Sequence, residues 1–462
     1  MRLRNITVKR LFGIFDHEIP LDKPDGVTII HGPNGFGKTV MLKMIAAAFQ
    51  NDSTIFRNIP FSEFSMEFVD GTVWKIMREY VKKRKSARGP RPECDLKVTN
   101  IDPAGSTTEM AISEAYEPGF LRAIDSHVPP PYHLASGGWT DDTGQVYSAD
   151  QILTMFPQAR AMLPPHYGAK LHSSNWGPPE LPVFVVETNR LDSARPLSQS
   201  EIRTSLSRYG RAELQPELLL RPLRVQQYSA DVVQRIKSVL ADYAKSSQER
   251  DRTFPERLVK FIREEKDTLG ERVILEQMQE LEKKRQRLIA LGFLDSETGL
   301  RDLTEEDVRK AREALTIYVG DVQAKLSAFD EMAERIGKLI DVVNDRFDYK
   351  NLKIHRENGF QVVSSVGDKI QLNDLSSGEQ HELVILYELL FRTPKSGLIL
   401  VDEPEISLHV AWQSRFLSDL IDILKLNDAY AVVATHSPVV IGTQWDLTKE
   451  LEGPPLAPTH EK

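Results

Sequence analysis

Short runs made only of apolar residues recur along the chain and predict buried strands. They occupy positions 27–30, 183–186, 398–401 and 431–434. Strands that are apolar throughout are typical of a parallel sheet covered on both faces. Runs with helical periodicity follow two of them, at Val40–Phe49 and at about Val410–Leu424. The pattern therefore predicts an α/β fold, with a mixed sheet and flanking helices.

Strict alternation of apolar and polar residues marks a second kind of strand near the N-terminus. The stretch 61–77 alternates on both sides of Asp70-Gly71, a typical hairpin turn, and predicts an antiparallel hairpin. Further short strands are expected at 352–355, 361–364 and 369–372, followed by a helix from about His381 to Phe391.

Residues 229–347 are rich in charge and have helical periodicity. Apolar residues keep near-heptad spacing over 274–288 and again over 308–329, with a break at 292–304 that contains glycine, aspartate and serine. This pattern predicts a short helical hairpin of coiled-coil type, inserted as an arm.

These patterns divide the chain into five segments. We expect residues 1–95 to form the N-terminal part of an α/β head, and 96–228 an irregular insertion with one core strand near 183–187. Residues 229–347 form the helical arm, 348–450 the C-terminal part of the head, and 451–462 a proline-containing flexible tail.

Composition and charge limit the setting and the partners. The formal net charge is -8, so a nucleic-acid contact would need a local basic patch. Lys82–Arg91 is such a cluster, and we expect either a DNA-backbone contact or, more in keeping with its lack of aromatics, a solvated loop tip. One cysteine and no long apolar run favour a soluble cytoplasmic protein without membrane partners.

A glycine-rich loop lies between the strand at 27–30 and the helix that follows. Strand, glycine-rich loop and helix form the context of a phosphate-binding P-loop. In such a loop Lys38 supplies a cation for the phosphates of ATP, and Thr39 a hydroxyl for Mg²⁺. The expected nucleotide-binding residues are Gly32, Pro33, Asn34, Gly35, Phe36, Gly37, Lys38 and Thr39.

Polar residues follow two more of the apolar strands. Because ligands of parallel sheets sit at the carboxyl ends of the strands, we expect these residues and the P-loop to share one cleft. Asp402 is the candidate ligand of Mg²⁺, and Glu403 the candidate general base for an attacking water. His436 is expected to contact the γ-phosphate or that water, so Glu403, His436 and Lys38 are the candidate catalytic residues.

The stretch Leu375–Gln380 resembles the signature motif of ABC-class ATPases. Together with the P-loop, Asp402-Glu403 and Thr435-His436, in that order, it is similar to the SMC, RecF and OLD group. Residues 375–383, 402–409 and 434–438 more narrowly resemble bacterial OLD-like ATPases of anti-phage defence, such as those of the PARIS and Septu systems.

The resemblance implies a second nucleotide contact. In this class the signature residues bind the γ-phosphate of ATP held by another protomer, which implies a homodimer, or a higher homo-oligomer, with ATP sandwiched inside. The positions that match are Ser376, Ser377, Gly378 and Glu379. Ile406–His409 matches the D-loop, and Thr188-Asn189 is the candidate substitute for a missing Q-loop glutamine.

Two functions are consistent with these residues. The first is an ATP-driven dimeric switch or scaffold that controls a separate effector protein in trans, a nuclease being one candidate. Its motivation is a complete ATP site with no second catalytic domain after His436. The alternative is a DNA-repair or DNA-end-binding ATPase of the SMC and RecF kind, motivated by the resemblance and by Lys82–Arg91.

Overall fold

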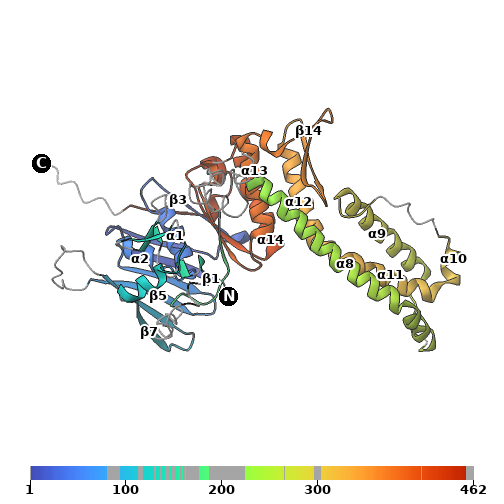
Figure 1. The fold of residues 1–462 in the computed structure, drawn as a ribbon, viewed down its shortest axis with the longest axis horizontal. Helices are drawn as coiled ribbons and strands as arrows, with labels where there is room; N and C mark the ends of the chain where they lie inside the picture. The colour runs from blue at the N-terminus through green and yellow to red at the C-terminus, as the bar shows by residue number, and fades with distance from the viewer. Residues whose placement is uncertain are drawn as a thin grey trace. The chain divides into compact units, whose positions relative to one another are not determined.

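The computed structural model describes most of the chain in two compact units (Figure 1). The first unit takes the described residues up to 186 and from 392 onward, and the second takes residues 224–391. Each unit is described by itself. The structure describes residues 2–80, 94–112, 118–129, 132–135, 138–140, 146–147, 152–153, 155–156, 159, 162, 176–186, 224–264, 266–295, 303–406 and 408–453.

A five-stranded parallel sheet forms one half of the first unit. Its strand order is β11-β15-β16-β3-β17. The strands are β11 (Val183–Val186), β15 (Leu398–Asp402), β16 (Tyr430–Ala434), β3 (Val27–His31) and β17 (Thr448–Glu450). The four apolar runs of the sequence therefore form adjacent parallel strands, and the predicted α/β fold is confirmed.

A six-stranded antiparallel sheet forms the other half, in the order β2-β1-β4-β5-β6-β7. Its strands are β1 (Leu3–Leu11), β2 (Phe15–Pro20), β4 (Glu63–Phe68), β5 (Val73–Tyr80), β6 (Cys94–Ile101) and β7 (Thr107–Ile112). β4 and β5 pair around a turn in which Gly71 has a φ of 90°, which confirms the predicted hairpin.

One hydrophobic core joins the two sheets through helix α1 (Lys38–Phe49). Apolar residues of α1, of β1 and β4, and of β15 and β16 all belong to this core. The small residues Ala46, Ala47 and Ala48 of α1 are buried in it, and they allow close packing of the helix. The position of α1 is thus fixed from both sides.

Smaller elements complete the first unit. They are η1 (Pro24–Gly26), α2 (Ser53–Asn58), α3 (Pro118–Asp125), β8 (His133–Ala135), β9 (Gly138–Thr140), β10 (Val146–Tyr147), η6 (Pro404–Ile406), α14 (Val410–Asn427), α15 (Pro438–Ile441) and η7 (Trp445–Leu447). β8, β9 and β10 form a three-stranded antiparallel sheet with a small core of its own around Trp139.

The second unit consists of helices and one small antiparallel sheet. Its helical elements are α8 (Arg224–Arg263), α9 (Glu271–Ala290), α10 (Glu305–Lys310), α11 (Arg312–Leu326), η3 (Ser327–Phe329), α12 (Asp330–Arg346), η4 (Leu372–Asp374), α13 (Ser377–Tyr387) and the π-helical turn Glu388–Arg392. The sheet contains β12 (Lys350–His355), β13 (Gly359–Ser364) and β14 (Lys369–Ile370).

The predicted two-run arm is joined by a third, longer helix. α9 and α11 pack together around Ile274 and Val319, on either side of the predicted break. α11 also packs against α8, where the buried carboxylate of Asp321 accepts hydrogen bonds from Arg250 and Arg257 at 3.1 and 2.7 Å. These hydrogen bonds hold the pKa of Asp321 below its usual value, although burial alone would raise it.

Some expectations change, and others lie outside the described part of the chain. The helix expected from about His381 begins four residues earlier, at Ser377, because Ser376 caps it. The expected segment 348–450 is divided between the two units, because residues 348–391 belong to the unit of the long helices. The five-segment division itself stays a prediction. Lys82–Arg91, Thr188-Asn189 and 454–462 lie outside the described residues. Among the described helices, none is both long and apolar enough to cross a membrane.

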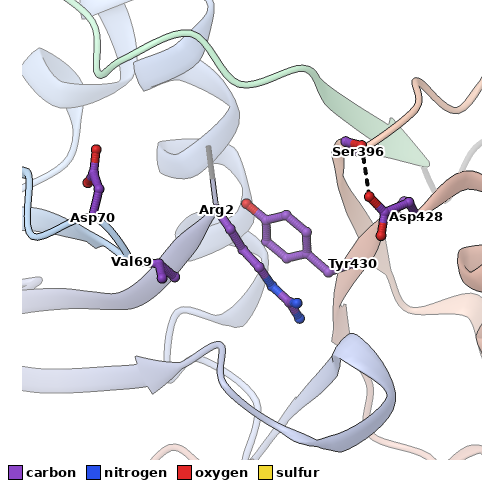
Figure 2. A pocket seen from close by; sticks show the side chains of 7 residues that line it. Arg2, Val69, Asp70, Ser396, Asp428 and Tyr430 are labelled. Carbon is purple, nitrogen blue, oxygen red and sulfur yellow. Dashed lines mark hydrogen bonds between the residues drawn. The ribbon is translucent and has the colours of Figure 1, made fainter.

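A pocket of about 750 Å³ lies at the amino ends of the parallel strands, the edge opposite the P-loop. Figure 2 shows Arg2 lying across the ring of Tyr430, with the guanidinium carbon 5.1 Å from the ring centre. Beside them the hydroxyl of Ser396 donates to Asp428. The buried Tyr430 hydroxyl accepts the backbone N–H of Leu3 at 3.1 Å, so it ties β1 to the start of β16.

Replacing Tyr430 with phenylalanine should lower the free energy of unfolding by about 1 kcal/mol, because the N–H of Leu3 loses its buried partner. Burial raises the pKa of Tyr430 from 10.0 to about 12. The wild-type free energy of unfolding should therefore carry a component that is complete below pH 10 and lost as the pH rises through about 12, and the variant should lack it. Urea unfolding at pH 8 to 12 measures both effects. Tyr349→Phe, at an 82% exposed position, is the control, and equal losses in the two variants would contradict the interpretation.

Candidate nucleotide site

The carboxyl ends of three neighbouring strands bring the predicted site residues together. β15 pairs with β16 and β16 with β3, so Asp402, Ala434 and Ile30 lie side by side across the sheet. The hydroxyl of Thr39 donates to the carboxylate of Asp402 at 3.1 Å, across 363 residues of sequence. The expected convergence of the P-loop and the β15 end is therefore present in this structure.

Two glycines give the P-loop its backbone conformation. Gly35 and Gly37 have φ values of 86° and 91°, which residues with a side chain rarely adopt. A Cβ on Gly37 would lie 2.5 Å from a methyl group of Leu11, whereas a Cβ on Gly35 would meet no atom within 4 Å. Gly37 is thus required by packing, and Gly35 borders open space beside the helix start.

Lys38 lies inside the loop rather than on its surface. Its side chain is buried, and Nζ donates to the carbonyl oxygens of Gly32 and Pro33 at 2.7 and 3.0 Å. Burial lowers the pKa of Lys38, while the negative charges of Glu403 and Asp402 act in the opposite direction. The ammonium is therefore the cation that faces the carboxylates at the end of β15.

The two carboxylates after β15 differ in environment. Burial raises the pKa of Asp402, although the hydrogen bond from Thr39 opposes that shift. Glu403 has a φ of 42°, in the left-handed region, and its N–H donates to the carbonyl of Ala434 at 2.8 Å. Such a conformation costs about 1–3 kcal/mol and is found most often at functional sites. The backbone therefore leaves the strand direction at Glu403, directly beside the end of β16.

His436 follows the end of β16, as the sequence predicted, and it is exposed. Its backbone N–H donates to Oε1 of Glu405 at 2.7 Å. The sequence interpretation gave Glu405 no role, although a carboxylate two positions after Glu403 was a usable signal. Glu405 is therefore an additional residue of this site.

His17 is a second residue that sequence reasoning missed. It is 4% exposed, and its Nε2 lies 2.8 Å from the carbonyl oxygen of Phe36 in the P-loop. Because a carbonyl can only accept, the ring must carry a proton on Nε2. Burial lowers the pKa of His17. The sequence could have indicated that His17 is buried, because it alternates with Phe15 and Ile19, which lie on the same buried face of β2.

The signature residues lie in the second unit, at the start of α13, and divide into two pairs. Ser376 caps the helix, and the carboxylate of Glu379 accepts hydrogen bonds from its N–H and hydroxyl at 2.8 and 2.9 Å. Glu379 also binds Lys350 at 2.7 Å, and these contacts hold its pKa below the usual value despite burial. Ser377, which is exposed, and Gly378, which is half-buried, lie in the first turn of the helix.

The donor set fits a magnesium ion shared with a nucleotide. Thr39 and Asp402 contribute a hydroxyl and a carboxylate oxygen that already lie within hydrogen-bond distance. Mg²⁺ typically takes one or two protein oxygens and completes its octahedron with phosphate and water. Among the described residues no cluster of three or more His, Cys, Asp or Glu side chains could form a protein-only metal site.

The two P-loop glycines give a test of the site. Gly35→Ala should weaken ATP binding by about tenfold or more, or 1.4 kcal/mol, because its methyl enters the space beside the helix start. Its stability loss should be about 1–2 kcal/mol from backbone strain. Gly13→Ala is the control, since Gly13 has a φ of 84° and the same open surroundings. Calorimetric binding and thermal unfolding measure the two effects, and equal binding losses in both variants would contradict this assignment.

Gly37→Ala should differ from both. Its Cβ would collide with Leu11, so about 1–3 kcal/mol of overpacking adds to the backbone strain. A stable Gly37→Ala protein with normal binding would show that this loop packs differently from the description above.

The similar solved structures align over most of this chain, but their TM-scores and sequence identities are low. The Smc head domain of Pyrococcus furiosus, solved with an extended coiled coil and the C-terminal domain of ScpA, is 13% identical and has a TM-score of 0.31. That alignment covers 95% of this chain and 91% of that chain. The SMC head domain of Thermotoga maritima is 11% identical with a TM-score of 0.29, over 96% and 91% of the chains.

Sequence similarity to a curated protein is confined to one segment. Protein ea59 of Escherichia phage lambda is 41% identical over 76 residues. The segment covers 16% of this chain and only 14% of the phage protein.

A family model gives the broader match. The model described as "AAA domain, putative AbiEii toxin, Type IV TA system" matches residues 201–442, more than half of the chain. The matched range contains the signature residues, Asp402-Glu403 and His436, and the P-loop precedes it. The chain therefore belongs to this AAA family.

Proposed function

We propose that the chain is an ATP-hydrolysing switch or scaffold that works as a dimer and controls a separate effector protein. The observation that carries this proposal is the link between Thr39 and Asp402 beside the strained Glu403, at one edge of the parallel sheet. It supports phosphoryl chemistry rather than binding alone, because residues with a strained backbone cluster at active sites.

Each residue of the site has a part in the proposed reaction. Lys38 and the N–H groups at the start of α1 would hold the β- and γ-phosphates, and Thr39 with Asp402 would hold Mg²⁺, which neutralises phosphate charge when bound. Glu403 would accept a proton from the attacking water. The water oxygen would bond to the γ-phosphorus as the bond to the bridging oxygen breaks, and ADP and phosphate would leave. His436 would stabilise the charge on the transferred group.

The signature helix supports a dimer in which each site uses two copies. Ser377 and Gly378 lie in the first turn of α13, where free N–H groups and the helix dipole favour an anion. Ser376 and Glu379 are engaged with each other and with Lys350, so we assign them to holding this turn in shape. We propose that Ser377 and Gly378 of one copy meet the γ-phosphate bound by the P-loop of the other.

The cellular role we propose is that of the sensor ATPase in a bacterial anti-phage defence system. The family description names a toxin of a toxin–antitoxin system, which by its name pairs two components. Such a pairing favours a trans-acting effector, a nuclease being one candidate. The alternative of a DNA-end-binding ATPase depends on Lys82–Arg91, outside the described residues, and stays a prediction.

Mixing two inactive variants tests the shared site. Lys38→Ala should abolish ATP binding in its own P-loop and leave its signature intact, whereas Ser377→Arg should do the reverse. When equal amounts of the two variants pair at random, half of all dimers contain one copy of each. Each of these dimers has one intact site of two. Steady-state ATP hydrolysis of the mixture should therefore recover to about a quarter of the wild-type rate.

Each variant alone is the control and should remain inactive. A mixture as inactive as its components would contradict a site shared between copies, and wild-type activity of Ser377→Arg alone would remove the signature from the reaction. Light scattering of Glu403→Gln with ATP, which should trap the dimer, gives a second measurement independent of turnover.

A further inference from the structure

Two side chains connect the segment after β15 with the segment after β16. The first is Glu405, whose Oε1 accepts the backbone N–H of His436 at 2.7 Å across 31 residues of sequence. Its Oε2 is enclosed and has no hydrogen-bond partner among the described residues. Enclosing a carboxylate oxygen without a partner is costly, so this position is not explained by stability alone.

The second is Gln413 on α14, which is 9% exposed. Its Nε2 donates to the carbonyl oxygens of Glu405 and Leu408 at 3.1 and 3.2 Å. Its Oε1 accepts the hydroxyl of Ser437 at 3.1 Å. One amide therefore uses both donors and its acceptor to hold two loops in register.

The loops joined in this way carry the two groups closest to the proposed chemistry. Glu403 directly precedes residues 404–406, and its own N–H donates to the carbonyl of Ala434 at the end of β16. His436 and Ser437 follow that strand by two and three residues. Any movement of residues 404–406 would strain the hydrogen bonds that Glu405 makes with His436 and Gln413, and so would displace His436.

We propose that Glu405 and Gln413 are positioning residues that make the place of His436 depend on the conformation of residues 404–406. Neither residue exchanges a proton in the reaction; each acts through hydrogen bonds to the backbone and to Ser437. Under the proposed function, on which this inference rests for its catalytic consequence, the exposed side chains of Ile406 and Val410 face the second copy. Contact with that copy would then adjust His436 and couple hydrolysis to dimer formation.

Glu405→Ala and Glu405→Gln separate positioning from charge chemistry. Glutamine keeps an oxygen that can accept the N–H of His436, whereas alanine removes it. Glu405→Ala should lower kcat about tenfold or more with an unchanged Kd for ATP, because a small displacement of a reacting group is enough for such a loss. Glu405→Gln should stay within about threefold of the wild type.

Gln413→Met should reproduce the loss seen in Glu405→Ala. Methionine keeps the length of the side chain and removes all three hydrogen bonds. Ser418→Ala, on the exposed face of the same helix, is the control and should behave as the wild type. Thermal unfolding of each variant checks that the fold is kept.

Amide hydrogen exchange over residues 435–441 is the readout that does not require turnover. Exchange in this segment should accelerate in Glu405→Ala and Gln413→Met and stay at the wild-type rate in Glu405→Gln. Glu405→Gln as inactive as Glu405→Ala would overturn the proposal in favour of charge chemistry. Unchanged exchange and kcat in Glu405→Ala would overturn it outright. If the wild type fails to hydrolyse ATP or the mixed variants fail to complement, the proposed function fails, while the exchange result still decides the coupling.

Discussion

The parallel pairing of β15, β16 and β3 is the constraint on which the rest of the site depends. Backbone hydrogen bonds fix these strands in a register where Asp402, Ala434 and Ile30 are neighbours, and each strand end then continues into a functional loop. No single loop could define the site, since its parts come from opposite ends of the chain. The sheet supplies the distance control that a reaction needs, and the loops supply the chemical groups.

Within that frame, the backbone of the loops is held by side chains that do no chemistry themselves. His17 anchors the carbonyl of Phe36, and in a trans peptide the following N–H must point the opposite way. Glu405 anchors the N–H of His436 in the same manner. Both anchors lie on one element and act on another, so each loop is fixed by its neighbour.

The fold of the head could be predicted from the sequence further than the details of the site could. The apolar runs at β3, β11, β15 and β16 and the glycine-rich loop are strong local signals with one physical interpretation each. The role of Glu405 depends on which backbone N–H lies near it, which no local pattern encodes. The spacing of Ser376 and Glu379 did indicate the early start of α13, because these two residues form a capping box. The same residues had been assigned to nucleotide binding, and their capping role was therefore missed. The long α8 was harder, because its charged pattern does not show which helices it packs against.

The site contains an excess of negative charge, because three acidic residues lie close together at the end of β15. Asp402, Glu403 and Glu405 all act on Lys38, and their mutual repulsion contributes to the raised pKa of Asp402. Burial is the largest cause of that raised pKa, because a carboxylate loses solvation in the interior. Lys38 and Lys43, whose positive charge also acts on Asp402, do not balance three carboxylates and the phosphates of ATP. A divalent cation held by Thr39 and Asp402 would supply the missing charge, so nucleotide and metal should bind this edge of the sheet together rather than independently.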